Sequence, residues 1–313
     1  DDELAKSDWS EKSKICKSLK LQSKLGEAGC PYYRKLLRPT KRLIDRWSSE
    51  IYSAEEFTVN AESENLCPYE LNKLLLKKAQ IVIVPYVYFF EDFIRKYLLG
   101  WMDTTIDKII TIVDEAHNLP DWSREAASES LSVDSLHRAS QESDKFGLLL
   151  GDGSPPTLFL DLVESALKSL GEYHISEGDD EGLLPSHIVS LDSEVPTFET
   201  EMMSLGKMTL YRLKQQSSDL SKMGQLIRQT LLEKGKRPRS YLGSVGDFLC
   251  RWLDSIESHT IRLVGNKPLR LEKVCLDPRV MTSFLDETAG VVMMSGTLSP
   301  LGMFRDLVGL KPE

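Results

Sequence analysis

The feature that most constrains this chain is a β-branched apolar run that ends directly in two carboxylates. Ile109-Ile-Thr-Ile-Val113 is followed at once by Asp114, Glu115, Ala116 and His117. Such a run is typical of a strand buried in a parallel sheet, and in open α/β folds ligands bind beyond the carboxyl ends of the strands. The pattern therefore predicts that Asp114 and Glu115 lie at a ligand-binding edge of a sheet.

Two adjacent carboxylates in this position suit nucleotide hydrolysis. Mg²⁺ prefers oxygen ligands, and a second carboxylate can orient and deprotonate the attacking water. In this interpretation Asp114 holds Mg²⁺, Glu115 is the base, and His117 senses the terminal phosphate of ATP. The structural alternative is that Asp114 only begins an acidic helix, where its charge is favourable to the helix dipole.

A second apolar run, Gly290 to Met294, ends in the hydroxyl-bearing turn Ser295-Gly-Thr297. These hydroxyls could hydrogen-bond to the acidic pair and couple the nucleotide state to DNA binding, although such a turn commonly only caps a helix. Earlier in the chain, Ile81-Val-Ile-Val84 is predicted to be a strand and Phe89 to Trp101 a helix. Strand, helix and strand in this order predict an α/β fold with a parallel sheet buried on both faces.

The beginning of the chain is strongly basic, although the whole chain carries a formal net charge of -9. Between Lys12 and Arg46 there are eleven basic residues against two acidic ones. Aromatic residues stand among them, and that combination suits single-stranded nucleic acid, whose bases stack and whose phosphates are negative. About half of the aromatic residues are expected to be core. The basic residues singled out as phosphate ligands are Lys12, Lys14, Arg34 and Lys35.

Three of the five cysteines, Cys16, Cys30 and Cys67, lie within residues 1 to about 75, which are expected to form a small, loop-rich module. Thiolates in a positive setting suit soft metals or iron–sulfur clusters, but three ligands do not complete a four-cysteine site. The alternatives are ordinary buried thiols or a structural zinc site. Cys250 and Cys275 are interpreted as packing residues. An odd number of cysteines favours a reducing compartment.

Most of the remaining chain is predicted to be helical, because apolar residues recur at three- and four-residue steps. The longest apolar run, Ile81 to Phe90, is too short for a membrane span and contains Pro85, so no membrane partner is expected. The N-terminus has no start methionine and no signal-peptide pattern, and the chain is expected to be truncated. The predicted helices are Pro39–Glu50, Leu158–Leu170, Thr197–Lys234, Leu242–Ile256 and Val280–Leu285, and the predicted hairpin strands are Ile261–Val264 and Leu269–Leu276.

These motifs together resemble the XPD family of superfamily 2 DNA helicases, relatives of FANCJ and DinG. The short cysteine module makes the resemblance closest to archaeal members. It implies a 4Fe–4S module (1–75) and a helical Arch domain (132–260) inserted into the first RecA-like motor domain (76–131 and 261–313). The matching motifs are Cys16, Cys30-Pro-Tyr, Cys67-Pro-Tyr, Ile81 to Tyr88, Val113 to Leu119, Cys275-Leu-Asp-Pro278 and Met294 to Pro300.

The resemblance also implies roles for individual residues. Cys16, Cys30 and Cys67 would be the second, third and fourth cluster ligands, with the first ligand before Asp1. His117 would act with Ser295 and Thr297 to couple ATP hydrolysis to movement. Three tyrosines fall at positions that resemble strand-contacting ones, namely Tyr33, Tyr86 and Tyr88.

The implied activity of the intact protein is that of a monomeric, ATP- and Mg²⁺-dependent 5′–3′ DNA helicase. It would act on single-strand and fork DNA in repair, such as nucleotide excision repair, with repair proteins docking on the Arch. Its location would be cytoplasmic in an archaeon and nuclear in a eukaryote.

Two parts of such helicases are absent from the sequence. There is no Gly-x-x-x-x-Gly-Lys-Thr loop to bind phosphates, and the chain stops soon after Ser295-Gly-Thr297, without the second motor domain and its arginine finger. This chain alone is therefore expected neither to hydrolyse ATP nor to unwind DNA. The chief rival interpretation is a non-catalytic module that binds DNA and docks partners.

Overall fold

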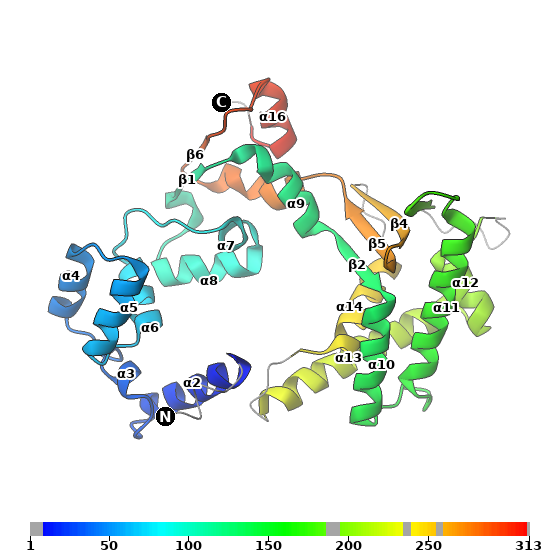
Figure 1. Cartoon of the computed structure of the whole chain (residues 1–313), viewed down its shortest axis with the longest axis horizontal. Coiled ribbons are helices and arrows are strands. Elements are labelled where there is room, and N and C mark those ends of the chain that lie inside the picture. The colour runs from blue at the N-terminus through cyan, green and yellow to red at the C-terminus, as the bar shows by residue number, and fades with distance from the viewer. Residues whose placement is uncertain (1–8, 186–194, 234–238, 255–258, 312–313) are drawn as a thin grey trace. The chain divides into compact units, whose positions relative to one another are not determined.

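The computed structural model describes residues 9–185, 195–233, 239–254 and 259–311, and the chain divides into two compact units (Figure 1). The first unit is built from residues up to Ala116 together with 281–298 and 310–313, and the second from residues 117–280 and 299–309. Within the described residues, no helix is long and apolar enough to cross a membrane.

The N-terminal part of the first unit is helical rather than loop-rich as the sequence suggested. Proline opens α3 and α6, where a missing N–H costs nothing. Ser53 and Glu56 form a reciprocal capping box that starts α5. The helices are α2 (Trp9–Lys24), α3 (Pro31–Arg34), α4 (Lys41–Ser49), α5 (Ala54–Ser63), α6 (Pro68–Leu76), α7 (Tyr86–Phe90) and α8 (Asp92–Met102).

A small aromatic core holds α4, α5 and α6 together. Trp47 is 3% exposed, and its ring centroid lies 5.1 Å from that of Tyr52 and 5.2 Å from that of Phe57. Leu71 and Ala61 complete this core. The helix predicted at 39–50 is confirmed as α4.

The parallel sheet of the first unit consists of β1 (Ile110–Val113) and β6 (Gly290–Met293), with Val113 opposite Met293. Both predicted strands and their parallel relation are confirmed. Burial on both faces is not, because Ile110 and Ile112 are 66% and 63% exposed. Two short 3₁₀ helices, η1 (Ile106–Lys108) and η3 (Ser283–Glu287), precede β1 and β6.

The strand predicted at Ile81–Val84 is wrong for this structure. Residues 81–85 form no regular element, and Ile81 and Ile83 are 82% and 93% exposed. A β-branched run becomes a strand only when a neighbouring strand satisfies its backbone, and no strand of the described residues pairs with it.

The second unit combines helices with a four-stranded antiparallel sheet of order β2-β5-β4-β3. The predicted hairpin is confirmed as β4 and β5, and it pairs on both sides with strands of this unit. The strands are β2 (Glu129–Ser132), β3 (Glu181–Leu184), β4 (Thr260–Asn266) and β5 (Leu269–Cys275).

The helices of the second unit follow the predicted apolar periodicity, with one difference. The long helix expected from Thr197 to Lys234 is broken, because Lys207 adopts a left-handed φ of 44° and ends α12. Ile256 and Lys234, the predicted helix ends, lie outside the described residues. The helices are α9 (Leu119–Ala127), α10 (Val133–Phe146), α11 (Pro156–His174), α12 (Phe198–Gly206), α13 (Leu210–Glu233), α14 (Tyr241–Leu253) and α16 (Leu301–Val308).

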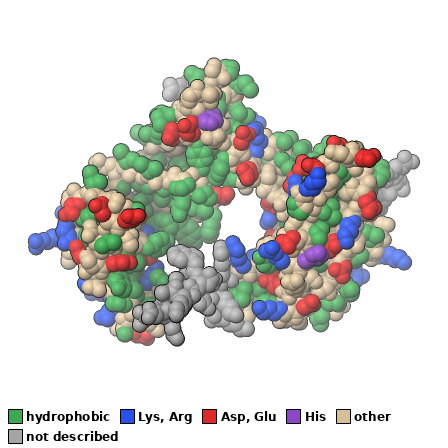
Figure 2. Space-filling model, viewed as in Figure 1, with side chains coloured by type: hydrophobic (Ala, Val, Ile, Leu, Met, Phe, Trp, Pro, Cys, Tyr) green, Lys and Arg blue, Asp and Glu red, His purple; other side chains and the backbone are tan. Residues whose placement is uncertain are grey.

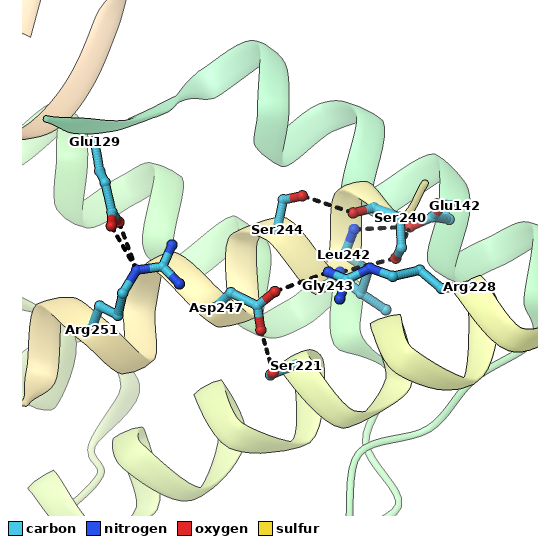
Figure 3. A network of polar contacts seen from close by, with 10 residues as sticks. All are labelled: Glu129, Glu142, Ser221, Arg228, Ser240, Leu242, Gly243, Ser244, Asp247 and Arg251. Carbon is cyan, nitrogen blue, oxygen red and sulfur yellow. Dashed lines mark hydrogen bonds and ion pairs between the residues drawn. The ribbon is translucent and has the colours of Figure 1, made fainter. Parts of the chain in front are cut away.

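Helices α13 and α14 of the second unit cross closely at two glycines. A Cβ placed on Gly224 would lie 2.0 Å from the Cα of Gly243, so neither position has room for a side chain. Figure 3 shows Arg228 of α13 beside this crossing, where it pairs with Asp247 of α14 at 2.9 Å. Asp247 also accepts a hydrogen bond from Ser221. The glycines therefore set the distance between the helices, and polar contacts set their register.

Candidate functional site

The two predicted motifs lie at the same edge of the parallel sheet. The backbone N–H of Met294 donates to the carbonyl of Val113 over 2.9 Å, and the N–H of Ala116 donates back to the carbonyl of Met294 over 2.9 Å. The ladder therefore continues past both strands into the turns that carry Asp114 and Ser295. The two turns are therefore neighbours, and the hydrogen bonds expected between the hydroxyls and the acidic pair stay a prediction.

The acidic turn has an unusual backbone. Glu115 has a φ of 47°, in the left-handed region that non-glycine residues seldom occupy. The Oδ1 atom of Asp114 accepts a hydrogen bond from the N–H of Glu115 over 3.0 Å. Both acidic residues are exposed. The carboxylates are thus accessible to a hydrated cation and a polyanionic ligand.

The hydroxyl turn on β6 is organised locally. The N–H of Thr297 donates to Oγ of Ser295 over 3.3 Å, and the two hydroxyl oxygens lie 3.4 Å apart. His117, in η2 (Ala116–Asn118), is exposed and belongs to the second unit. The structure therefore places Asp114, Glu115, Ser295 and Thr297 on one unit, and the coupling role of His117 remains a prediction.

The side chain of Tyr86 contacts the backbone of the acidic turn. Its hydroxyl lies 2.6 Å from the carbonyl oxygen of Asp114 and 3.2 Å from that of Glu115. Burial, followed by the nearby charges of Asp114 and Glu115, raises the pKa of the Tyr86 hydroxyl, which keeps its proton for donation. Tyr88, two residues later, is 41% exposed. The sequence did not indicate that these two tyrosines would differ.

The two Cys-Pro-Tyr motifs have the same local structure. Cys30 and Cys67 are the residues immediately before α3 and α6, and the proline of each motif opens the helix. The N–H of Cys67 donates to the carbonyl of Tyr32 over 3.2 Å, which joins the two motifs. Burial raises the pKa of the Cys16 thiol; Lys20 lowers it, and Cys67 and Cys30 raise it further. Cys16 therefore lies within electrostatic range of the other two thiols.

The thiols of Cys16, Cys30 and Cys67 are chemically suited to a metal site, but their positions in the described part of the chain do not form one. Sulfur donors suit soft metals and iron–sulfur clusters. Among the residues that the structure describes, however, no three Cys, His, Asp or Glu side chains converge on one metal position. Within that part of the chain, the arrangement does not distinguish a zinc ion from an iron–sulfur cluster.

The predicted phosphate-binding residues are partly engaged within the cysteine module. Arg34 donates to the carbonyl of Ala28 over 3.3 Å, and Lys35 donates to that of Glu64 over 2.7 Å. Both are exposed. The Tyr33 ring lies 5.3 Å from the Lys20 ammonium. The side chains of Lys12 and Lys14 lie outside the described residues.

The sequence reasoning missed an aromatic–cationic cluster on α6 and α8. The ammonium of Lys73 lies 4.1 Å from the ring centroid of Tyr69 and 4.5 Å from that of Trp101. Tyr97 and Phe93 continue the row along α8, at 52% and 70% exposure. Figure 2 shows apolar side chains at the surface over this part of the first unit. The four-residue spacing of Phe93, Tyr97 and Trp101 was the available signal.

Comparison with known proteins agrees with this geometry. The DEAD_2 family model matches residues 2–136, and the "helical and beta-bridge domain" model matches residues 194–310. Each model covers less than half of the chain. Together the two matches support the resemblance to XPD-like superfamily 2 helicases that the sequence motifs indicated.

Three relatives and one solved structure illustrate the similarity. The ATP-dependent DNA helicase CHL1 of Vanderwaltozyma polyspora is 24% identical over 93% of this chain and 34% of its own length. The Fanconi anemia group J protein homolog of Gallus gallus is 30% identical over 43% of the chain and 10% of its own length. Human regulator of telomere elongation helicase 1 is 25% identical over 58% and 16%. A solved apo XPD structure covers 73% of the chain and 37% of its own, with a TM-score of 0.43 and 20% identity.

The chain spans about a third of the length of the CHL1 relatives that it matches.

Proposed function

We propose that this chain is part of an ATP-dependent DNA helicase in which Asp114 and Glu115 serve ATP hydrolysis. The observation that carries the proposal is the continuous β1–β6 ladder, which ends in an exposed acidic turn and an adjacent hydroxyl turn. Two groups of relatives support it, because one is named an ATP-dependent DNA helicase and the other a regulator of telomere elongation helicase.

The chemistry follows from the positions of the two carboxylates. Bound Mg²⁺ would neutralise charge that develops on the phosphates during transfer. Asp114 would hold its water shell, because its carboxylate is exposed and directed by the Glu115 N–H. Glu115 would orient and deprotonate the attacking water. Ser295 and Thr297 would hydrogen-bond across the shared sheet edge and couple hydrolysis to movement.

The domain arrangement is proposed with two changes from the sequence-based limits of 131 and 261. We assign residues 1–75 to an iron–sulfur module, 76–128 to the motor domain, and the region from β2 onward, which pairs with β5, to an Arch domain that docks repair partners. The β4–β5 hairpin pairs only with strands of the second unit within the described residues. This supports placing the return to the motor domain near Met281 rather than at residue 261.

The substitution Glu115→Gln in the full-length protein tests the function. It should lower DNA-stimulated ATP hydrolysis by about 10²–10⁴-fold, which is the usual contribution of a general base, while ATP affinity stays unchanged. The matched control is Glu125→Gln, the same chemical change at an exposed position of α9. Turnover retained by Glu115→Gln would contradict the proposal.

Strand polarity is tested separately. We propose 5′–3′ movement along single-stranded DNA, with fork DNA as the substrate. Duplexes carrying only a 5′ or only a 3′ single-stranded tail should be unwound unequally by the full-length protein, with the 5′ tail required. Unwinding that needs the 3′ tail would contradict the polarity without contradicting the activity.

A further inference from the structure

The hydroxyl of Tyr86 holds two consecutive backbone carbonyls. Tyr86 is the first residue of α7, and its Oη atom lies 2.6 Å from the oxygen of Asp114 and 3.2 Å from that of Glu115. A hydroxyl carries one proton, so the shorter contact is the principal hydrogen bond and the longer one shares it. The two carbonyls belong to the peptide planes on either side of the Glu115 Cα atom.

These two peptide planes determine the backbone dihedrals of Glu115 and therefore the direction of its Cα–Cβ bond. The φ of 47° at Glu115 is strained for a residue with a side chain and persists only when neighbouring groups enforce it. The Ala116 N–H, bonded to the Met294 carbonyl, fixes the exit of the turn. Tyr86 fixes its middle.

Tyr86 is itself held by a packed aromatic cluster in the same unit. Its ring makes an edge contact with Phe90 at 5.6 Å, and Phe90 makes another with Phe284 at 5.6 Å. The guanidinium of Arg95 lies 3.6 Å from the Phe284 centroid and donates to the carbonyls of Phe89 and Phe90. Phe89 and Phe90 are 9% and 3% exposed. The hydroxyl therefore projects from a fixed support.

We infer that Tyr86 is a positioning residue for ATP hydrolysis: its hydroxyl fixes the Asp114–Glu115 turn and so aims the Glu115 carboxylate. This inference rests on the proposed function of the acidic pair. It differs from the strand-contacting role that the family resemblance implied for Tyr86. Small errors in the orientation of a catalytic group reduce the rate of the chemical step more than they reduce binding.

The substitution Tyr86→Phe in the full-length protein tests the inference, because it removes the hydroxyl and keeps the ring. One neutral hydrogen bond corresponds to about a three- to tenfold loss in kcat for DNA-stimulated ATP hydrolysis. KM for ATP and Kd for single-stranded DNA, measured by fluorescence anisotropy, should stay within about twofold. Tyr211→Phe, the same chemical change at a 77% exposed position of α13, is the matched control and should leave all three constants unchanged.

Three results would overturn the inference. A wild-type kcat for Tyr86→Phe would show that the hydroxyl does not aim Glu115. A weaker DNA affinity with an unchanged kcat would assign the hydroxyl to DNA instead. A lower ATP affinity and a lower melting temperature together with the lower kcat would indicate a general structural role. Glu115→Gln distinguishes these results from failure of the proposed function. Turnover would survive in that variant only if the acidic pair took no part in ATP hydrolysis.

Discussion

The backbone N–H of Ala116 donates to the carbonyl of Met294 over 2.9 Å, and this bond joins the acidic turn to the hydroxyl turn. Ala116 follows the acidic pair, and Met294 precedes the hydroxyl turn. The bond extends the parallel ladder beyond the last paired residues, Val113 and Met293. It is the route along which the proposed coupling between the carboxylates and the hydroxyls would run.

The aromatic–cationic cluster on α6 and α8 predicts a single-stranded DNA contact. Replacing Trp101 by Ala should weaken binding of single-stranded DNA by about 1–3 kcal/mol, which is the usual loss of one stacking side chain. Replacing Lys73 by Ala should weaken binding and reduce its salt dependence by about one phosphate contact. Fluorescence anisotropy over a range of salt concentrations measures both effects.

The control for this surface is Tyr173→Ala on α11, which is 56% exposed and stands in the other unit. It should leave DNA affinity unchanged. Affinity that drops equally in the control would mean that general aromatic contacts, rather than this cluster, hold the strand.

The three thiols of the cysteine module predict an iron–sulfur cluster in the full-length protein. Because such clusters are held by cysteine thiolates, Cys67→Ser should lower bound iron and visible absorbance. Cys250→Ser, on α14 of the second unit, should leave both unchanged. The prediction fails if metal analysis finds zinc in place of iron, or if the two variants bind equal amounts of iron.

The glycine crossing of α13 and α14 predicts a steric requirement. A Cβ at Gly243 would lie 2.5 Å from the Arg228 Nη2 atom and 2.8 Å from the Gly224 Cα atom. Gly243→Ala should therefore lower the free energy of unfolding of the second unit by about 1–3 kcal/mol, as overpacking does. Gly302→Ala in α16, where a Cβ meets nothing within 4 Å, should be neutral or stabilising. Chemical denaturation compares them, and equal stability of the two variants would contradict the prediction.

The buried ion pair between Arg262 and Glu199 predicts the largest stability change. The residues are 7% and 2% exposed, their charged atoms lie 2.9 Å apart, and Arg262 also donates to the Trp252 carbonyl. Glu199→Ala leaves a buried charge without its partner, so it should cost about 3–5 kcal/mol of unfolding free energy. The partly exposed pair of Arg251 and Glu129, shown in Figure 3, provides the comparison.

Glu129→Ala should cost less than about 1 kcal/mol, because solvent screens an exposed pair. Unfolding in urea, followed by circular dichroism, gives both values. A loss for Glu199→Ala as small as that for Glu129→Ala would show that the buried pair does not stabilise the second unit.

Much of the local structure followed from sequence pattern. The strands at 110–113 and 290–293, the hairpin at 260–275 and most helices of the second unit appear near their predicted positions. Apolar periodicity is a local property, and it sets which face of an element is buried. One error falls where a strand needs a partner, because residues 81–84 pair with no strand of the described residues. The other is the cysteine module, which is helical because its helix caps outweigh its weak apolar periodicity.

The sequence by itself determined the chemistry available to this protein: two carboxylates after a strand, hydroxyls after another, and three cysteines in the N-terminal module. Only the tertiary structure decided which of these groups meet. It paired β1 with β6 and directed the Tyr86 hydroxyl to the carbonyls of the acidic turn. The reason is that pairing depends on contacts between residues far apart in the chain, and no local pattern records them.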